Sequence, residues 1–517
     1  MMTRSVAATR SPLVLALDLG TSAVRAIVYD RWGRTVEGLA SQVDYSLHTT
    51  ADGGVEADPT AMVAALETVL DAVLARAGSR ADQLVAVGFS MLVSNVLGIG
   101  AGGQPLTPVY TYADTRSAPA AAALRSRLNA HAVHQRTGAP LHASYLPARL
   151  LWLQQSEPEQ FRRVVRWLSV GEYFYLQLFG EARASLSVAS WTGLLNRQTL
   201  DWDHELLAAV GVSPTALSPL GDLHAPARGL RPAPAARWPA LARVPWLLPV
   251  ADGACNNIGA GCLSPARVAL MIGTSGAMRV VLPDDSSMRV PAGLWLYRVD
   301  RRRALLGGAT SEGGSLYAWL RATLRLNADD SALESALAAL PPDSHGLTVL
   351  PFLAGERSQG WNDAARAAIV GLSLDTTPKA ITRAGLEAVA YRFGLLFERL
   401  RPHLPPDATI IASGGALQHS PLWTQMFADV LARPVVLSGE PEASSRGAAL
   451  LALEALSLLE ELQMAPAALG RAFEPDPERH EIYVAAMGRQ QALYQALFGP
   501  GRAEGEQSRS ANEAFCF

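Results

Sequence analysis

Two stretches about 250 residues apart share an arrangement whose residue types suit phosphate. In "LALDLGTSAVRAIVYD" (residues 15–30) and "RVALMIGTSGAMRVVL" (residues 267–282), an apolar run ends in Gly-Thr-Ser and a second apolar run follows at once. Backbone N–H groups and hydroxyls gathered in one turn can bind phosphate oxygens. A hairpin that only had to turn would favour Asn-Gly or Asp-Gly at its tip. The repeated pattern therefore favours phosphate binding over a plain hairpin, and the candidates are Gly20, Thr21, Ser22, Gly273, Thr274 and Ser275.

The first of these turns has a charged residue on each side. Asp18 ends the first apolar run and could hold Mg²⁺, directly or through water, because this cation prefers oxygen ligands. Arg25 lies far enough along the second run to point back over the turn and clamp a phosphate. The alternative is a surface salt bridge on an ordinary hairpin.

A second acidic residue, Asp252, stands in "LPVADGACNNIGAGC" (residues 248–262), where an apolar strand meets a helix start with spaced glycines. A carboxylate at the wall of a cleft could accept the proton of a substrate hydroxyl. An Asp before a helix is also a common N-cap. On this stretch alone the N-cap is the favoured interpretation.

Small residues at two further strand ends would let a ligand approach the backbone closely. In "IIASGGALQHSPLW" (residues 410–423) the strand runs into Gly414, Gly415 and Ala416, and "LLGGATSEGG" has Gly308 in a similar place. A tight junction between strand and helix explains both patterns equally well.

The segment "YTYADTRS" (residues 110–117) places Asp114 and Arg116 on one side of an extended stretch in which tyrosines alternate. Such a mixture suits a polyhydroxylated ligand. A surface ion pair is the alternative, and the sequence alone favours it.

The composition excludes several classes of protein. The net charge of −3 gives no reason to expect nucleic acid or an anionic membrane as a partner. Lys379 is the only lysine, so the chain has no P-loop. The 3 cysteines form no metal-ligand array and indicate reduced thiols in a cytoplasmic protein. The uncharged run 84–103 contains glycines and polar residues, which favours a buried strand, a turn and another strand over a membrane span.

The elements around these residues follow a strand–turn–strand pattern in each half. In the first half the three strands begin near Leu13, and a helix is expected after Asp58 as N-cap and Pro59 as first residue, ending before Gly78. In the second half, residues 378–400 predict an amphipathic helix. The two halves indicate a weak internal duplication, which would place the two Gly-Thr-Ser turns across a cleft.

With 517 residues the chain is too long for one core, and we expect two domains, residues 13–248 and 249–500. The polar ends, residues 1–12 and 501–517, are predicted to be disordered. The proline-rich stretch 224–249 is interpreted as an inter-domain connection or an extended surface element.

Together and in this order, seven stretches resemble the FGGY family of carbohydrate kinases. The resemblance implies an α/β fold of two actin/ribonuclease-H-like domains, the first binding sugar and the second ATP, with the active site in the cleft between them. The stretches are "LDLGTSAVRAIVYD", "TYADTRS", "VADGACNNIGAGC", "MIGTSGAM", "LPFLAGERSQGWNDAARAAIVGLS", "IIASGGALQHSPLWTQMFADVLARPV" and "EASSRGAAL".

The resemblance also implies roles for the candidate residues. Asp18 would organise Mg²⁺, and Asp252 would be the base for the sugar hydroxyl. Phosphates would be faced by Thr21, Ser22 and Arg25 from one side and by Thr274 from the other. Adenosine would lie against Gly414, Gly415 and Ala416.

Within the family the match leans toward the gluconate kinases, which implies the reaction of D-gluconate to 6-phosphogluconate. Such enzymes usually carry a histidine shortly after the strand "VGFS", where Ser94 and Asn95 stand in this chain. The carboxylate of an aldonate needs a cationic partner, for which Arg116 is the candidate. A pentulose kinase, acting for example on xylulose, and a non-catalytic actin-like binding protein are the alternatives. A homodimer is a further expectation.

Overall fold

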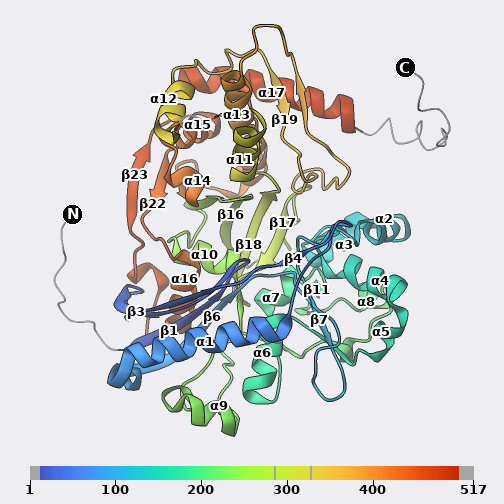
Figure 1. Cartoon of the computed structure of the whole chain (residues 1–517), viewed down its shortest axis with the longest axis vertical. Coiled ribbons are helices and arrows are strands. Elements are labelled where there is room, and N and C mark those ends of the chain that lie inside the picture. Colours follow the sequence, from blue (N-terminus) through green and yellow to red (C-terminus); the bar gives the residue numbers. More distant parts are fainter. Residues whose placement is uncertain (1–11, 285–286, 327–328, 500–517) are drawn as a thin grey trace.

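The computed structural model describes residues 12–284, 287–326 and 329–499, which form two sheets with helices around and between them (Figure 1). Apart from Pro12, the two ends predicted to be disordered lie outside the described residues.

The first sheet has the strand order β14-β6-β1-β2-β3. Strand β1 pairs antiparallel with β2 and parallel with β6, β2 pairs antiparallel with β3, and β14 is parallel to β6. The bounds are β1 (Leu13–Leu19), β2 (Ala23–Tyr29), β3 (Thr35–Asp44), β6 (Leu84–Met91) and β14 (Val250–Ala251). Strand β14 begins just after residue 248, so the last strand of this sheet comes from beyond the predicted domain division. The division at residue 248 stays a prediction.

The second sheet repeats this order at its centre. Strands β18, β16 and β15 are antiparallel neighbours, and β21 and β22 then continue in parallel with β15. Strands β17 and β23 flank them. The shared topology is the structural form of the duplication expected from the sequence. The bounds are β15 (Arg267–Ile272), β16 (Gly276–Pro283), β17 (Trp295–Arg298), β18 (Arg303–Thr310), β21 (Thr409–Ser413), β22 (Val435–Ser438) and β23 (Leu469–Phe473).

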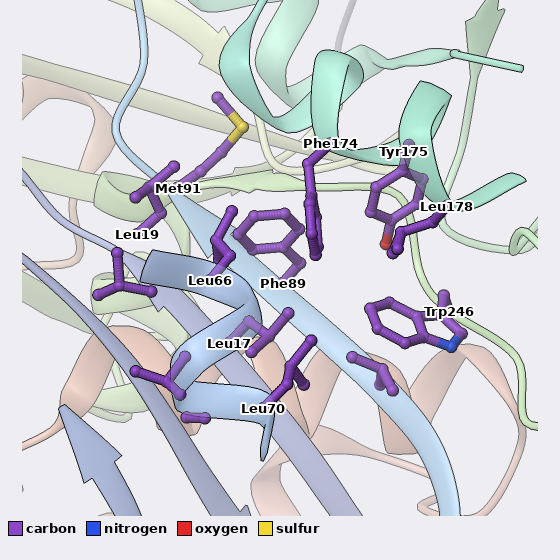
Figure 2. Close-up of a cluster of buried hydrophobic side chains, with 14 of the residues drawn as sticks. Leu17, Leu19, Leu66, Leu70, Phe89, Met91, Phe174, Tyr175, Leu178 and Trp246 are labelled. Atoms are coloured by element: carbon purple, nitrogen blue, oxygen red, sulfur yellow. The ribbon is translucent and has the colours of Figure 1, made fainter. Parts of the chain in front are cut away.

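The predicted first helix is present as α1 (Pro59–Ala77). The Asp58 side chain accepts hydrogen bonds from the backbone N–H groups of Thr60 and Ala61, and Gly78 ends the helix. Helix α1 packs on β2 and β3 beside α6 (Val170–Phe179). Its apolar side chains join those of β1, β6 and α6 in the core shown in Figure 2.

The proline-rich stretch 224–249 has an exposed part and a buried part. Its first part lies at the surface, as expected, but contains the short helix α9 (Pro232–Arg237), which has no buried residue, and so is not extended throughout. The last residues run beside β6, where Leu247 donates to the carbonyl of Val87 and Val87 donates to that of Pro245. The indole of Trp246 is fully buried in the core of Figure 2.

Helix α13 (Pro378–Leu400) has the predicted bounds but is not amphipathic along its middle. Every residue from Thr382 to Gly394 is buried. Helices α11, α12, α15 and α17 cover it on several sides, so no polar stripe is needed. These helices are α11 (Gly314–Thr323), α12 (Asp330–Ala338), α15 (Pro421–Leu431) and α17 (Pro477–Phe498).

Between the two sheets lie α10 (Asp252–Gly259) and α16 (Ala443–Ala455), in direct contact with each other. A Cβ on Gly259 would overlap the carbonyl oxygen of Ala443, and one on Gly447 would overlap that of Cys255. The backbones therefore touch where no side chain could be inserted.

Between β6 and β14 the chain builds a lobe with its own apolar core. The uncharged run 84–103 forms β6, a turn and β7, as expected. Among the described residues, no helix combines the length and apolarity needed to cross a bilayer. The lobe contains β7 (Leu97–Ile99), β8 (Val109–Tyr110), β9 (Arg166–Leu168), α2 (Ala118–Arg127), α3 (Ala130–Thr137), α4 (Leu146–Ser156), α5 (Pro158–Arg163), α7 (Leu186–Trp191) and α8 (His204–Ala209).

Candidate active site

A cavity of about 420 Å³ lies between the two sheets, and both Gly-Thr-Ser turns line it. Thr21 and Ser22 come from the turn between β1 and β2, and Gly273 to Ser275 come from the turn between β15 and β16. The structure therefore brings together two turns that are far apart in the chain, as the duplication predicted. We call this cavity the cleft.

The glycines of the two turns use their own N–H groups within the turns. Gly20 donates to the carbonyl of Ala23 at 2.9 Å, and Gly273 donates to that of Ser275 at 2.9 Å. Neither glycine N–H is then directed at a ligand, contrary to the expectation for Gly20. The groups left to face phosphate are those of the Thr and Ser residues that follow.

Asp18 lies buried at the end of β1, with a side chain that is 8% exposed. Its carboxylate accepts a hydrogen bond from the Ser90 hydroxyl at 2.7 Å and lies 3.7 Å from the Arg25 guanidinium. Burial raises the pKa of Asp18 to about 6 against the effect of the Ser90 hydrogen bond, and the charge of Asp252 raises it further. A buried carboxylate whose ionisation is made more costly by a second carboxylate nearby fits a site for a divalent cation.

Arg25 is held by more partners than the sequence suggested. Its Nε donates to Gln42 at 2.8 Å and lies 3.7 Å from the carboxylate of Glu442, in addition to its contact with Asp18. Glu442 directly precedes α16, so Arg25 links the first sheet to a helix of the second half.

Asp252 is the first residue of α10, and Ala251 occupies the N-cap position. The N-cap interpretation is therefore wrong. The Asp252 carboxylate accepts from the N–H of Gly253 at 2.7 Å and lines the cleft. Burial raises its pKa, and the positive charge of Arg279 opposes this shift. A half-buried carboxylate with few donors around it retains lone pairs for a substrate proton.

The segment after β21 packs against the second turn. Gly414 has a φ of 92°, and a Cβ there would overlap the carbonyl oxygen of Ile272, so only glycine fits. The next helix, α14 (Gly415–Gln418), begins beside Gly314, whose N–H donates to the carbonyl of Gly273 at 2.7 Å. Ala416 belongs to this junction, since a Cβ on Gly314 would lie 3.5 Å from its methyl group.

Gly308 does not face the cleft. A Cβ on this residue would meet the side chains of Leu396 and Ser358 on the opposite face of β18. Its neighbour Ala309 lines the cleft instead.

The adjacent residues Ser94 and Asn95 point to different places. Ser94 has a φ of 53°, lines the cleft, and donates to the carbonyl of Trp191 at 2.6 Å. Asn95 donates to the carbonyl of Leu92 and accepts from the N–H of Val170 at the start of α6. Its amide thus holds two elements together rather than facing the cavity.

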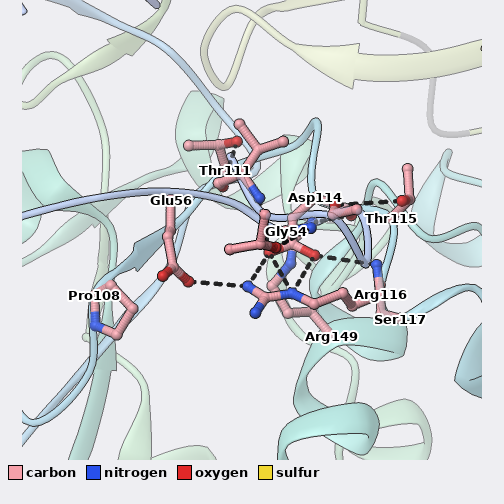
Figure 3. A network of polar contacts seen from close by, with 12 residues as sticks. Gly54, Glu56, Pro108, Thr111, Asp114, Thr115, Arg116, Ser117 and Arg149 are labelled. Carbon is pink, nitrogen blue, oxygen red and sulfur yellow. Dashed lines mark hydrogen bonds and ion pairs between the residues drawn. The ribbon is translucent and has the colours of Figure 1, made fainter. Parts of the chain in front are cut away.

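Asp114 and Arg116 lie in a turn rather than an extended segment, because β8 ends at Tyr110. The Arg116 guanidinium binds both Asp114 and Glu56, the latter at 2.9 Å (Figure 3). It also lies 4.8 Å from the ring centroid of Trp152. Neither residue lines the cleft. The ion pair that the sequence favoured is thus present, and Tyr112, between these residues and β8, reaches the cavity.

Replacing Arg116 with Gln is expected to lower stability rather than substrate affinity. Asp114 is 1% exposed and would keep a buried charge without its partner, which costs about 3 kcal/mol of unfolding free energy. Chemical denaturation measures this loss, and the KM for the sugar should stay unchanged. A raised KM in a variant of normal stability would instead restore Arg116 as a substrate ligand.

Two cleft residues that the sequence reasoning missed are Arg279 and Arg357. Arg279 follows the second turn within β16, much as Arg25 follows the first within β2. A single arginine in a strand otherwise buried and apolar was the available signal. Arg357 stands in an irregular segment between two short strands, where no periodicity marks it. Four aromatic residues of the cleft were missed as well: Tyr145, Trp191, Trp295 and Tyr297.

Comparisons with known proteins agree with this architecture. Residues 13–259 match the N-terminal domain, and residues 268–456 the C-terminal domain, of the FGGY family of carbohydrate kinases. A gluconokinase of Bacillus subtilis (strain 168) is 28% identical over 479 residues, which cover 90% of this chain and 91% of the relative.

Two solved structures from Lactobacillus acidophilus are similar over 94% of this chain and 98% of their own, each at 25% identity. A gluconate kinase has a TM-score of 0.85 and a ligand-bound xylulose kinase one of 0.86. The predicted fold of two actin/ribonuclease-H-like domains is confirmed. The chain therefore belongs to the FGGY family of carbohydrate kinases and is a phosphotransferase that acts on an alcohol group.

Proposed function

We propose that this chain is a gluconokinase, which transfers the γ-phosphoryl group of ATP to the terminal hydroxyl of D-gluconate and forms 6-phosphogluconate. The observation that carries the proposal is a half-buried carboxylate, Asp252, in a cleft lined by two opposed Gly-Thr-Ser turns. Phosphoryl transfer requires mainly positioning and charge neutralisation, and this arrangement supplies both.

In this reaction Asp252 accepts the proton of the hydroxyl as its oxygen bonds to phosphorus and the bond to the departing ADP breaks. Thr21 and Ser22 face the phosphates from the first domain, and Thr274 faces them from the second. Asp18, held by Ser90, is the ligand for Mg²⁺, which neutralises phosphate charge when bound. The junction around Gly414 receives the adenosine, since it has no bulky side chain at the second turn.

We assign sugar binding mainly to residues 13–248 and nucleotide binding to residues 249–500. The cytoplasm is the proposed location, since glycolytic-type phosphorylation consumes ATP there. Asp114 and Arg116 support the segment that carries Tyr112 into the cleft, and Asn95 supports Ser94.

A pentulose kinase is the second candidate, because the xylulose kinase structure is as similar to this chain as the gluconate kinase. The Ser94 hydroxyl, which lines the cleft, suits a neutral sugar and a sugar acid equally. A non-catalytic relative is disfavoured, since Asp252 lines the cleft and the buried Asp18 is close enough for the charge of Asp252 to raise its pKa.

The test is ADP release from the purified protein with Mg-ATP over D-gluconate, D-xylulose, D-ribulose, erythritol and glycerol. Turnover strongly selective for gluconate is the expected result. Selective turnover of xylulose or ribulose would leave a kinase but replace its substrate by a neutral pentulose. Nucleotide binding without turnover of any compound would favour the non-catalytic alternative.

A further inference from the structure

Arg279 and Arg357 are the two cationic side chains among the residues that line the cleft. Arg279 is 7% exposed, and its Nε and Nη1 atoms are buried without a hydrogen-bond partner among the described residues. The Nε of Arg357 is buried without a partner as well. A third donor in the same cavity, the indole Nε1 of Trp191, is also unpartnered.

The two arginines approach the cavity from different elements of the second domain. Arg279 projects from β16, and its guanidinium carbon would lie 3.3 Å from a Cβ on Gly253, next to Asp252. Arg357 lies 5.9 Å from the ring centroid of Tyr112, on the side of the inserted lobe. Burial, with repulsion from Arg357, lowers the pKa of Arg279 to about 10, although the charge of Asp252 opposes the shift.

The other buried arginines of the described residues each donate at least one side-chain hydrogen bond, although the Nε of Arg149 and the Nε and Nη1 of Arg392 are also without a partner. Arg149 donates to the carbonyls of Ser94, Asp114 and Ala143, and Arg446 donates to those of Gly33 and Gly259 among others. Arg279 has no such partner, although a buried donor without one is destabilising. An unpartnered cation at the wall of a binding cavity is the arrangement expected when the ligand supplies the missing acceptors.

We propose that Arg279 and Arg357 form the subsite that binds the carboxylate of an open-chain sugar acid, with the Trp191 indole as an additional donor. This inference rests on the proposed gluconokinase function and names the residues that distinguish an acid from a neutral sugar. The planar guanidinium offers paired donors that match a carboxylate. Arg116, the candidate from the sequence, is already neutralised by Asp114 and Glu56 outside the cleft.

The test compares D-gluconate with D-glucitol, which has the same chain of hydroxyls but a CH₂OH group in place of the carboxylate. In Arg279→Gln and in Arg357→Gln we expect kcat/KM for gluconate to fall about 100-fold, with no matching fall for glucitol. Arg279→Lys keeps the positive charge but not the paired donors of the guanidinium, so its kcat/KM for gluconate should fall less. Arg228→Gln, an exposed substitution, is the control and should change neither value.

A binding measurement makes the test independent of turnover. Isothermal titration of the wild type with gluconate, in the presence of a non-hydrolysable ATP analogue, should give heat that both arginine variants lose. The affinity of each variant for the analogue should be unchanged. If Arg279→Gln does not fold, Arg357→Gln carries the test, since that side chain is only half-buried.

Three results would overturn the proposal. Unchanged gluconate binding in both variants would exclude a carboxylate subsite at these arginines while leaving the gluconokinase function intact. Equal losses on gluconate and glucitol would assign the arginines to the transferred phosphoryl group or to Asp252. A wild type that turns over a neutral pentulose and not gluconate would refute the proposed function itself, and the subsite with it.

Discussion

The Asp252→Asn variant is expected to lose turnover by about 1,000-fold with gluconate as substrate. The amide has nearly the same shape and can still accept the hydrogen bond from the N–H of Gly253, so α10 should keep its position. It has no basic oxygen to take the hydroxyl proton. ADP release measures the loss, and titration with ADP should give an unchanged Kd.

The pH profile adds a readout that a structural role would not change. Asp252 acts only when ionised, and burial raises its pKa. The wild-type kcat/KM should therefore fall as the pH is lowered, at a higher pH than an ordinary carboxyl group would give. In Asp252→Asn the contribution of Asp252 to this limb is lost, and the limb that remains is that of Asp18, whose pKa falls when the charge of Asp252 is removed. Asp375→Asn, at an exposed position, is the control. A near-normal rate in Asp252→Asn would remove this residue as the base.

Adding one methyl group in Gly259→Ala is expected to be the most destabilising of the substitutions considered. Ala is ordinarily more favourable than Gly within a helix, by about 1 kcal/mol. Here the new Cβ would overlap the carbonyl oxygen of Ala443, a backbone atom that no rotamer change can move. Helices α10 and α16 would have to separate, and we expect a loss of about 3 kcal/mol or a failure to fold.

Gly488→Ala in α17 is the matched control, because a Cβ there meets nothing within 4 Å. The same chemical change should stabilise this variant, so the two melting temperatures should move in opposite directions from that of the wild type. Gly447→Ala, on the facing helix, should behave like Gly259→Ala. Equal and small effects of Gly259→Ala and Gly488→Ala would contradict a backbone-to-backbone contact between α10 and α16.

The sequence predicts the bounds of an element correctly where residues at its own ends determine them. Helix α1 begins and ends at the predicted residues because Asp58, Pro59 and Gly78 act within one turn of it. The polarity of α13 could not be predicted, because the helices that cover it come from separate parts of the chain.

The residues of the candidate site also fall into two groups, those that the local sequence marks and those that depend on the tertiary structure. The two turns and Asp252 stand at strand ends, where the sequence marks them, and the structure brings them to one cleft. Ser94 and Asn95 are neighbours of similar chemistry, and only the backbone conformation at Ser94 decides which one faces the cavity. Arg116 was a candidate for binding the substrate carboxylate because the sequence does not reveal its partner Glu56, which lies 60 residues away in the chain.

The contact of α10 with α16 determines how the two halves can move. Arg446 of α16 stabilises this contact, because its guanidinium donates to the carbonyl of Gly33, in the first domain, and to that of Gly259, at the end of α10. A rotation of one sheet against the other must therefore take place about this joint, with displacements that grow with distance from it. Asp252 begins the same short helix, so a rotation about this joint would displace it little. Such a rotation would change the separation of the two turns that line the cleft while the proposed base keeps its place.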